Sequence, residues 1–423
     1  MSSFGTVSRK QHPASTFGSK PKTAKQIKAA KLSSSLKKKG VGGRGSSNPF
    51  EKRNPPGYKK TSKLGEGGFG TVWDCTSEHT GRSFAVKQLV KGSTVEAKRN
   101  VKTGLNEQWF GRMWFSEGGK PRSRLGICEA MTPEEGNPGD EWLWDVNPSS
   151  YPGVKSIAKL VTTKDTSSDL WLVFEKCGLP LTELLWELKG SFYKSERIYT
   201  CRRRSFWNAM NADHAVLKKF LRHTIEAIEL ISSSNVVHSD LKPDNILVNY
   251  MRGETSFHSL KIIDFGSAYA FDDVKQVNSA TPEYLPPEAL ALHCSKKIGH
   301  SIADVQKNLR NNSCPHAVDM WSLGCIFLEI CAGFPLWFGY KSRVDTGFSG
   351  FLTGLFAVPG RSPEKIIARQ IEVVSSLPNV LKRFPEIGLS DDENAIDLLR
   401  RMLELDPQHR ISPADALQHP FLL

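Results

Sequence analysis

A glycine-rich run near the start of the patterned part of the chain has the residue types that bind phosphate. Residues Gly65 to Val72 read G-E-G-G-F-G-T-V and lie between two strand-like runs. Glycine lets the backbone approach phosphate oxygens closely and present its N–H groups to them. A dinucleotide site needs a helix directly after the glycines. Because a strand-like run follows here, the pattern disfavours a dinucleotide site and leaves a phosphate loop and a plain hairpin as alternatives.

A lysine further along could reach the same phosphates. Lys87 ends the run Ala-Val-Lys and lies fifteen residues after Val72. A lone lysine is usually a surface charge, but one on a largely apolar strand opposite a glycine loop can contact the α- and β-phosphates of a nucleotide. Such a lysine needs an acidic partner. We expect Glu107, on the helix that follows, with Glu96 as the alternative.

A third group of residues carries a family resemblance. Residues 238–245 read H-S-D-L-K-P-D-N, an apolar run follows, and the triplet Asp264-Phe265-Gly266 begins nineteen residues after Asn245. Together with the glycine-rich run and Lys87, in this order, the pattern resembles the eukaryotic protein kinase family over about residues 58–421. The resemblance implies an α+β fold of two lobes, a small β-rich lobe with one main helix and a larger, mainly helical lobe.

The resemblance also implies roles for the polar residues of the third group. Phosphoryl transfer requires in-line positioning of a hydroxyl and neutralisation of the charge on the transferring group. Asp240 would orient the substrate hydroxyl and accept its proton, and Lys242 would contact the γ-phosphate. Asn245 and Asp264 would hold two Mg²⁺ ions through hard oxygen atoms, which this cation prefers. The implied activity is a serine/threonine kinase that uses ATP and Mg²⁺ and acts on protein substrates.

A nucleotide pocket follows from the same resemblance. Backbone atoms of Glu175 and Cys177 would bind adenine, with Phe174 behind the ring and with Val72 and Ala85 covering it, as in a largely apolar pocket with few polar anchors. The expected ATP contacts are Gly65, Glu66, Gly67, Gly68, Phe69, Gly70, Val72, Ala85, Lys87, Phe174, Glu175 and Cys177.

One residue of the third group departs from the family pattern. Ser239 stands before Asp240, where many kinases carry an Arg that binds the phosphate of a phosphorylated activation loop. We therefore expect activity without activation-loop phosphorylation. Lys242 and the run Ser279 to Tyr284 resemble serine/threonine kinases rather than tyrosine kinases.

Hydrophobic patterning predicts the elements that would position these residues. Short apolar or alternating runs predict strands at 60–64, 70–76, 82–90, 157–162 and 170–174, and helical spacing predicts helices at 94–115, 179–188 and 217–231. The apolar stretch Trp321 to Tyr340 contains Glu329, so we expect a buried core helix rather than a membrane span. The kinase resemblance also implies a structural ion pair between Arg410 and Glu288.

Composition divides the chain into a basic tail and a near-neutral body. Residues 1–50 hold eleven of the 57 Lys and Arg and no Asp or Glu, which leaves 46 basic and 44 acidic residues in 51–423. We expect a disordered tail at 1–50, a small lobe at 58–178 and a large lobe at 179–423. Polar segments at about 116–155 and 292–315 are expected insertions, which, like the tail, could dock partner proteins.

The sequence also bears on other classes of function and on the location of the protein. A pseudokinase scaffold is the main rival, but the residues whose loss would mark one are all present: Lys87, Asp240, Asn245 and Asp264. Nucleic acid would bind only weakly and non-specifically, since the tail lacks Trp and Tyr. Scattered cysteines without an apolar leader predict an intracellular protein. The lysine-rich tail suits the cytoplasm or nucleus, with organelle import as an alternative.

Overall fold

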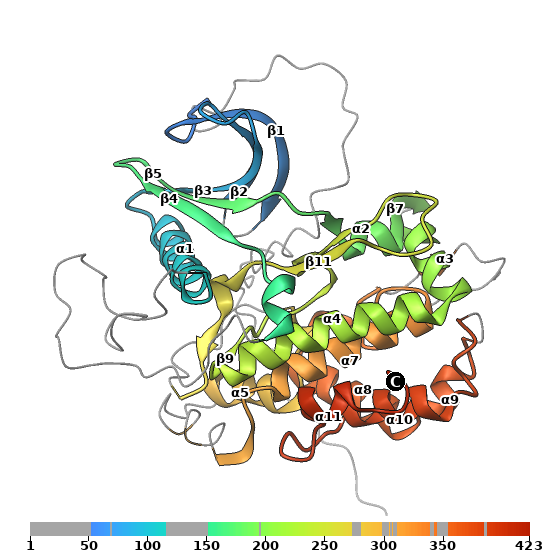
Figure 1. The fold of residues 1–423 in the computed structure, drawn as a ribbon. Helices are drawn as coiled ribbons and strands as arrows, with labels where there is room; N and C mark the ends of the chain where they lie inside the picture. The colour runs from blue at the N-terminus through green and yellow to red at the C-terminus, as the bar shows by residue number, and fades with distance from the viewer. Residues whose placement is uncertain are drawn as a thin grey trace, which may run out of the picture.

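A five-stranded sheet and a larger helical body form the two lobes of the molecule (Figure 1). The structure is a computed structural model, and it describes residues 52–67, 70–115, 151–193, 196–272, 281–297, 304, 307, 311–338, 342–344, 354–384 and 387–423. The predicted α+β, two-lobed fold is confirmed. The basic tail, the core of the first insertion at 116–150 and much of the second lie outside the described residues.

The small lobe is an antiparallel sheet with one long helix. Its elements are β1 (Tyr58–Gly67), β2 (Gly70–Ser77), β3 (Ser83–Val90), α1 (Val95–Met113), β4 (Leu160–Asp165) and β5 (Asp169–Glu175), and the strand order is β1-β2-β3-β5-β4. The strands predicted at 60–64, 70–76, 82–90 and 170–174 are confirmed. Gly70 has φ 155°, and a Cβ there would lie 2.5 Å from the carbonyl oxygen of Gln88, so the β1–β2 turn needs glycine at this position.

Helix α1 joins the sheet to the other lobe. Thr94 caps its N-terminus by accepting a hydrogen bond from the Ala97 N–H at 3.1 Å. Leu105 packs on a small-lobe cluster of leucines from β3, β4 and β5, whereas Phe110 and Trp114 belong to the main core of the large lobe. The helix predicted at 94–115 is therefore confirmed, and its apolar residues contact both lobes.

The large lobe consists mainly of helices around one core. Its elements are η2 (Pro152–Ser156), β6 (Leu179–Pro180), α2 (Leu181–Leu185), β7 (Trp186–Tyr193), β8 (Glu196–Arg203), α3 (Ser205–Ala212), α4 (His214–Ser233), β9 (Val236–Val237), η3 (Pro243–Asn245), β10 (Ile246–Asn249), β11 (Ser259–Ile262), η4 (Phe265–Ser267), β12 (Tyr269–Ala270), η5 (Pro282–Tyr284), α5 (Pro287–Lys297), α7 (Ala317–Ala332), β13 (Ser342–Val344), η6 (Pro359–Arg361), α8 (Pro363–Ser375), α9 (Leu377–Leu381), α10 (Glu393–Met402) and α11 (Pro413–Leu417).

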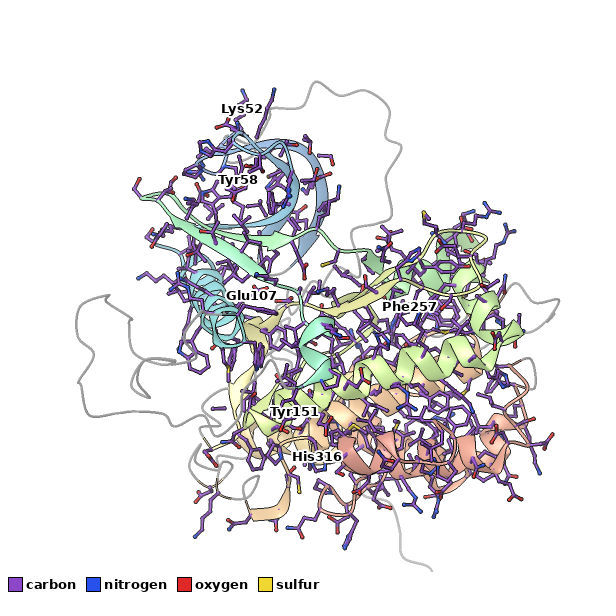
Figure 2. The ribbon with its side chains drawn as sticks, in the orientation of Figure 1. Lys52, Tyr58, Glu107, Tyr151, Phe257 and His316 are labelled. Carbon is purple, nitrogen blue, oxygen red and sulfur yellow. The ribbon has the colours of Figure 1, made fainter. Side chains whose placement is uncertain are left out.

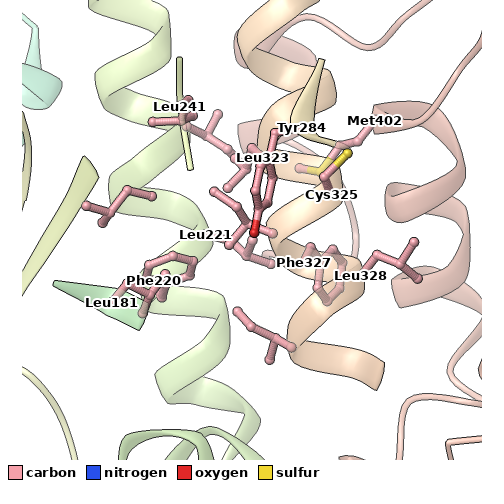
Figure 3. Packing of buried hydrophobic residues seen from close by; sticks show 14 of the residues in the cluster. Leu181, Phe220, Leu221, Leu241, Tyr284, Leu323, Cys325, Phe327, Leu328 and Met402 are labelled. Carbon is pink, nitrogen blue, oxygen red and sulfur yellow. The ribbon is translucent and has the colours of Figure 1, made fainter. Parts of the chain in front are cut away.

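The centre of this core lies between α4 and α7. Every residue of α7 is buried, and the apolar stripe predicted for residues 217–231 is the buried face of α4. Figure 3 shows Leu221 of α4 between α4 and α7, near Leu323 and Phe327, with Phe220 beside Leu181 and Met402 of α10 on the other side of α7. Burial of these side chains makes α7 a rigid support for the loops that begin or end on it.

Three predicted elements differ from the structure. Residues 179–188 were expected to be helical, but α2 ends at Leu185 and a strand begins at Trp186. The alternation of Trp186, Leu188 and Phe192 has the period of a strand, and this strand pairs with β8 in a hairpin that the sequence reading missed. The strand expected at 157–162 is shifted, since β4 runs from Leu160 to Asp165.

The third difference concerns the apolar stretch 321–340. The core helix α7 runs from Ala317 to Ala332 and ends at Gly333, which adopts φ 76° and donates its N–H to the Glu329 carbonyl at 2.8 Å. Residues 334–338 are therefore loop rather than helix, and most of them are buried. Within the described ranges, no helix is both long and apolar enough to cross a membrane. The cysteines described there are free thiols.

Candidate active site

Lys87 lies at the centre of a buried cluster of charges. Its Nζ atom is 2.6 Å from Oε2 of Glu107 and 2.9 Å from Oδ1 of Asp264. Figure 2 shows Glu107 on α1, at the level where the two lobes meet. Glu96, the alternative partner, is exposed in the first turn of the same helix. The structure thus brings together residues from β3, α1 and the end of β11.

Burial and mutual charge set the protonation of this cluster. Burial raises the pKa of Glu107 to about 7; Lys87 opposes this rise, and the Asp264 charge adds to it. Burial alone would lower the pKa of Lys87, but Asp264 and Glu107 outweigh it and raise the pKa above its usual value. Burial would raise the pKa of Asp264, yet Lys87 and then Lys242 hold it below its usual value. Lys87 is therefore a cation and Asp264 an anion at neutral pH.

Asp240 lies in a loop that fixes both of its carboxylate oxygens. Oδ2 accepts hydrogen bonds from Lys242 Nζ at 2.6 Å and from Asn245 Nδ2 at 3.3 Å, and Oδ1 accepts one from the Thr281 N–H at 3.2 Å. Burial raises the pKa of Asp240, while Lys242 opposes the rise. A buried, oriented carboxylate of raised basicity is suited to accept a proton from a hydroxyl group.

Asp319, near the N-terminus of α7, supports this loop from below. Its carboxylate accepts the backbone N–H groups of His238 at 2.8 Å and Ser239 at 3.0 Å. Ser239 adopts φ 64°, a conformation that costs energy for a non-glycine residue. No motif of the sequence analysis includes Asp319. Its position in the first turn of a fully buried helix is the signal that could have marked it as a support.

Asn245 and Asp264 carry the oxygens that could bind metal ions. The Asn245 amide nitrogen donates to the Asp240 carbonyl at 2.8 Å, which orients the amide and leaves its oxygen as an acceptor. One amide oxygen and one carboxylate fit Mg²⁺, which is usually held by few protein ligands together with phosphate oxygens and water. Among the described residues, no group of three or more His, Cys, Asp or Glu side chains could hold a metal ion by itself.

Comparison with known proteins agrees with this arrangement. The family model described as "Protein kinase domain" matches residues 153–422. The chain belongs to the protein kinase family. The match starts after α1, so the glycine-rich run, Lys87 and Glu107 lie before it.

Relatives of the chain include mitogen-activated protein kinases of several fungi. The chain is 34% identical over 220 residues to "Mitogen-activated protein kinase hog1" of Blastobotrys adeninivorans, covering 50% of this chain and 46% of that protein. It is 34% identical over 213 residues to HOG1 of Wallemia muriae (48% and 64%) and 33% identical over 209 residues to sty1 of Schizosaccharomyces pombe (49% and 52%). The chain spans about half the length of most relatives that it matches.

The nucleotide contacts expected from the sequence lie on β1, β2, β3 and at the end of β5. Ala85 lies opposite Phe174 in the β3–β5 register. The Glu175 side chain is already bound, by Lys261 Nζ at 2.6 Å and by the Lys159 N–H at 2.9 Å. The Glu175 N–H donates to the Lys159 carbonyl at 3.1 Å, and the Glu175 carbonyl oxygen accepts the Cys177 thiol at 3.5 Å. Burial raises the pKa of the Cys177 thiol to about 12, so this thiol is neutral.

The remaining expected ATP contacts divide between described and undescribed residues. Gly65, Glu66 and Gly67 lie on β1, and Gly70 and Val72 lie on β2. Gly68 and Phe69, at the tip of the turn, lie outside the described residues.

Two ion pairs fix the segment around η5 in this kinase. Arg410, whose side chain is fully buried, binds the Glu288 carboxylate through two nitrogens at 2.7 and 3.2 Å, as expected from the sequence. Arg361 binds both carboxylate oxygens of Glu283, a contact that the sequence reading missed. The partners lie 78 residues apart, so no local pattern could have shown it.

Proposed function

We propose that the chain is a protein serine/threonine kinase that transfers the γ-phosphate of ATP to hydroxyl groups of protein substrates. The observation that carries the proposal is the bridge from Lys87 to both Glu107 and Asp264, which joins the phosphate-contacting lysine, α1 and the metal-binding carboxylate in one cluster. Such a cluster is the arrangement that phosphoryl transfer requires.

The described residues have separate tasks in this reaction. Lys87 orients the α- and β-phosphates, and Lys242, whose pKa is raised by Asp240 against the effect of burial, stays charged near the γ-phosphate. Mg²⁺, when held by Asn245 and Asp264, would neutralise the phosphate oxygens. Asp240 orients the substrate hydroxyl and takes its proton as the oxygen bonds to phosphorus and the bond to the β-phosphate oxygen breaks. These roles follow from the family resemblance and fit the geometry.

We further propose that activity does not require phosphorylation of the activation loop. Ser239 replaces the Arg that would bind such a phosphate. Its side chain is buried, and its hydroxyl donates to the Ser267 carbonyl at 2.8 Å, just after Asp264. The serine therefore contacts the metal-binding segment directly. Enzyme treated with phosphatase should keep most of its turnover, whereas loss of nearly all turnover would contradict this part of the proposal.

The activity itself is tested with a peptide library and labelled ATP. Asp240→Asn keeps the size of the side chain but removes the proton acceptor, so we expect a loss of phosphate transfer of about a hundredfold or more. Asp165→Asn, an exposed carboxylate at the end of β4, is the matched control and should leave transfer unchanged. Equal transfer by wild type and Asp240→Asn would reject the kinase mechanism. A pseudokinase would bind nucleotide without any transfer.

We also propose partners and a cellular location for the chain. Protein substrates follow from the proposed reaction, and docking through the segments at about 116–155 and 292–315 is inferred from their length. Deletion of residues 295–312 should raise KM for a protein substrate and spare a short peptide. An intracellular location is proposed because ATP is available there.

A further inference from the structure

Asn106, the neighbour of Glu107 on α1, contacts the backbone that follows Asp264. Its Nδ2 atom lies 2.8 Å from the carbonyl oxygen of Ala268, 3.1 Å from that of Gly266 and 3.4 Å from that of Phe265. Three carbonyl groups thus converge on one side-chain amide. The contact joins a helix of the small lobe to a segment more than 150 residues away in the sequence.

In the segment from Phe265 to Ala268, the one carbonyl that Asn106 does not contact is that of Ser267, and a different residue binds it. Ser267 lies between Gly266 and Ala268, and its carbonyl oxygen accepts the Ser239 hydroxyl at 2.8 Å. Each carbonyl oxygen from Phe265 to Ala268 is therefore within hydrogen-bond distance of Asn106 or Ser239. One donor comes from α1 and the other from the loop that carries Asp240.

This segment needs support because its backbone starts from a costly conformation. Asp264 has φ 65° and ψ 63°, in the left-handed region that non-glycine residues seldom adopt. A conformation of this kind persists only where surrounding contacts hold it. The segment also approaches α1 closely, since a Cβ at Gly266 would lie 2.4 Å from Cγ2 of Thr103.

The contacting residues of α1 form one helical face. Thr103, Asn106, Phe110 and Trp114 follow at helical spacing. The Phe265 ring lies 6.5 Å from the Phe110 ring and 5.0 Å from the Trp114 ring, between centroids. Asn106 is the hydrogen-bond donor of this face toward the segment. Apolar contacts alone would tolerate sliding, whereas hydrogen bonds to successive carbonyls fix the register.

We propose that Asn106 is a positioning residue that holds Asp264 in its metal-binding conformation, together with Ser239 and without a phosphorylated loop. This inference rests on the proposed function, because it explains how the kinase site is kept assembled. Asn106 does not touch substrate; it acts through the backbone of residues 265–268. Its loss should therefore weaken the Mg²⁺-dependent part of nucleotide binding and loosen this segment.

The test compares two amides of α1 that face different ways. Asn106→Asp keeps the shape but replaces the donor by an acceptor facing carbonyl oxygens, and Asn106→Ala removes the group. Gln108→Glu and Gln108→Ala are the matched controls, since Gln108 donates to Thr163 at 3.3 Å and not to the segment. Thermal unfolding of each variant establishes the temperature range in which it is folded. If Asn106→Asp does not fold, the positioning role of Asn106 is tested with Asn106→Ala alone.

Two readouts do not depend on turnover. Calorimetry measures the affinity for a non-hydrolysable ATP analogue with and without Mg²⁺, and hydrogen exchange measures protection of amides 264–270. For the Asn106 variants we expect affinity about tenfold weaker with Mg²⁺, little change without it, and faster exchange in the segment. The Gln108 variants should behave like wild type in both measurements.

Three results are informative. Wild-type affinity and exchange in Asn106→Ala would overturn the proposal. Equal loss with and without Mg²⁺ would also overturn it, because a general weakening of α1 predicts no metal dependence. If the wild-type chain binds the Mg²⁺-bound analogue but transfers no phosphate, the proposed function fails while the positioning role is still decided by these two readouts.

Discussion

The ammonium group of Lys87 lies between two carboxylates, and the two have different tasks in the proposed reaction. Asp264 is expected to coordinate a metal ion. Glu107 is then the carboxylate that holds Lys87 near the phosphates. Because Glu107 is 4% exposed, water cannot replace it.

Glu107→Gln keeps a hydrogen-bond acceptor but removes the charge. A charge-assisted hydrogen bond contributes about 1.5–3 kcal/mol, so we expect kcat/KM to fall by about 10- to 150-fold with little change in fold. Glu96→Gln is the matched control, an exposed glutamate on the same helix that should leave kcat/KM within about twofold of wild type. Steady-state kinetics of peptide phosphorylation measure both. Similar effects of the two changes would contradict the assignment of Glu107.

A buried carboxyl outside the site makes the stability of the fold depend on pH. Glu329 of α7 accepts hydrogen bonds from the Tyr284 hydroxyl at 2.6 Å and from the Leu336 N–H at 2.8 Å. Burial raises its pKa to about 8. Since the folded state keeps the proton that the unfolded chain releases near pH 4.5, stability from this group is complete below that pH and is lost as pH rises toward 8, by about 1.4 kcal/mol per unit.

Glu329→Gln cannot titrate, so its unfolding free energy should fall less between pH 5 and pH 8 than that of wild type. Urea unfolding at several pH values between these limits measures the difference. Parallel pH profiles for the two proteins would show that Glu329 is ionised in the folded state, contrary to this expectation.

At the scale of elements, helix α1 is held close to the sheet by glycine. A Cβ at Gly111 would lie 2.9 Å from Cβ and 3.0 Å from Cδ2 of Leu160 on β4. Alanine is a better helix former than glycine by about 1 kcal/mol. The Cβ atom of Leu160, however, is fixed to the backbone of β4 and cannot rotate away. An alanine at position 111 would gain stability from its helix propensity and lose stability from the clash with Leu160. Because the contact would be so short, we expect the loss to be larger.

We expect Gly111→Ala to lower the unfolding free energy by about 1–3 kcal/mol and to reduce kcat/KM, because α1 must shift away from β4 and takes Glu107 with it. Lys102→Ala, on the exposed side of α1, is the control and should be neutral or slightly stabilising. Denaturant unfolding and kinetics provide the two measurements. A stability gain in Gly111→Ala would mean that the helix accommodates the methyl group without moving.

Helices and strands with a clear hydrophobic periodicity could be predicted from the sequence. Features that depend on residues far away in the chain could not. The stripe from Leu217 to Ile231 predicted α4, and alternation predicted β2 and β3. The β7–β8 hairpin was missed because its first residues continue the apolar pattern of α2. In the site, Lys87 and its partner Glu107 could be named from motif order, whereas Asn106 could not, since its acceptors lie more than 150 residues away.

In the whole molecule, a buried ion pair joins the middle of the large lobe to its C-terminal part. Arg410 binds Glu288 and also donates to the Ala317 carbonyl at 2.7 Å and to the Glu404 carbonyl at 2.9 Å. Its guanidinium group thus connects the start of α5, the start of α7 and the segment after α10. Removal of such a cation leaves an acidic group and two carbonyls without their partner in the protein interior.

Arg410→Met should therefore lower the unfolding free energy by about 3–5 kcal/mol. Arg400→Met, which breaks an exposed pair with Asp397, should cost no more than about 1 kcal/mol. Urea unfolding of the full chain measures both values. Costs of similar size would show that the buried pair contributes no more than a surface pair does.

The position of Phe265 has a consequence for inhibitor design. Its ring lies against Phe110, Trp114 and, at 4.7 Å between centroids, His238, and the backbone beside it is held through Asn106. A compound that must displace this ring has to break aromatic contacts in both lobes before it can bind. A compound that only mimics adenine and phosphate leaves them intact. Nucleotide mimics should therefore bind this chain at a lower conformational cost than molecules that displace Phe265.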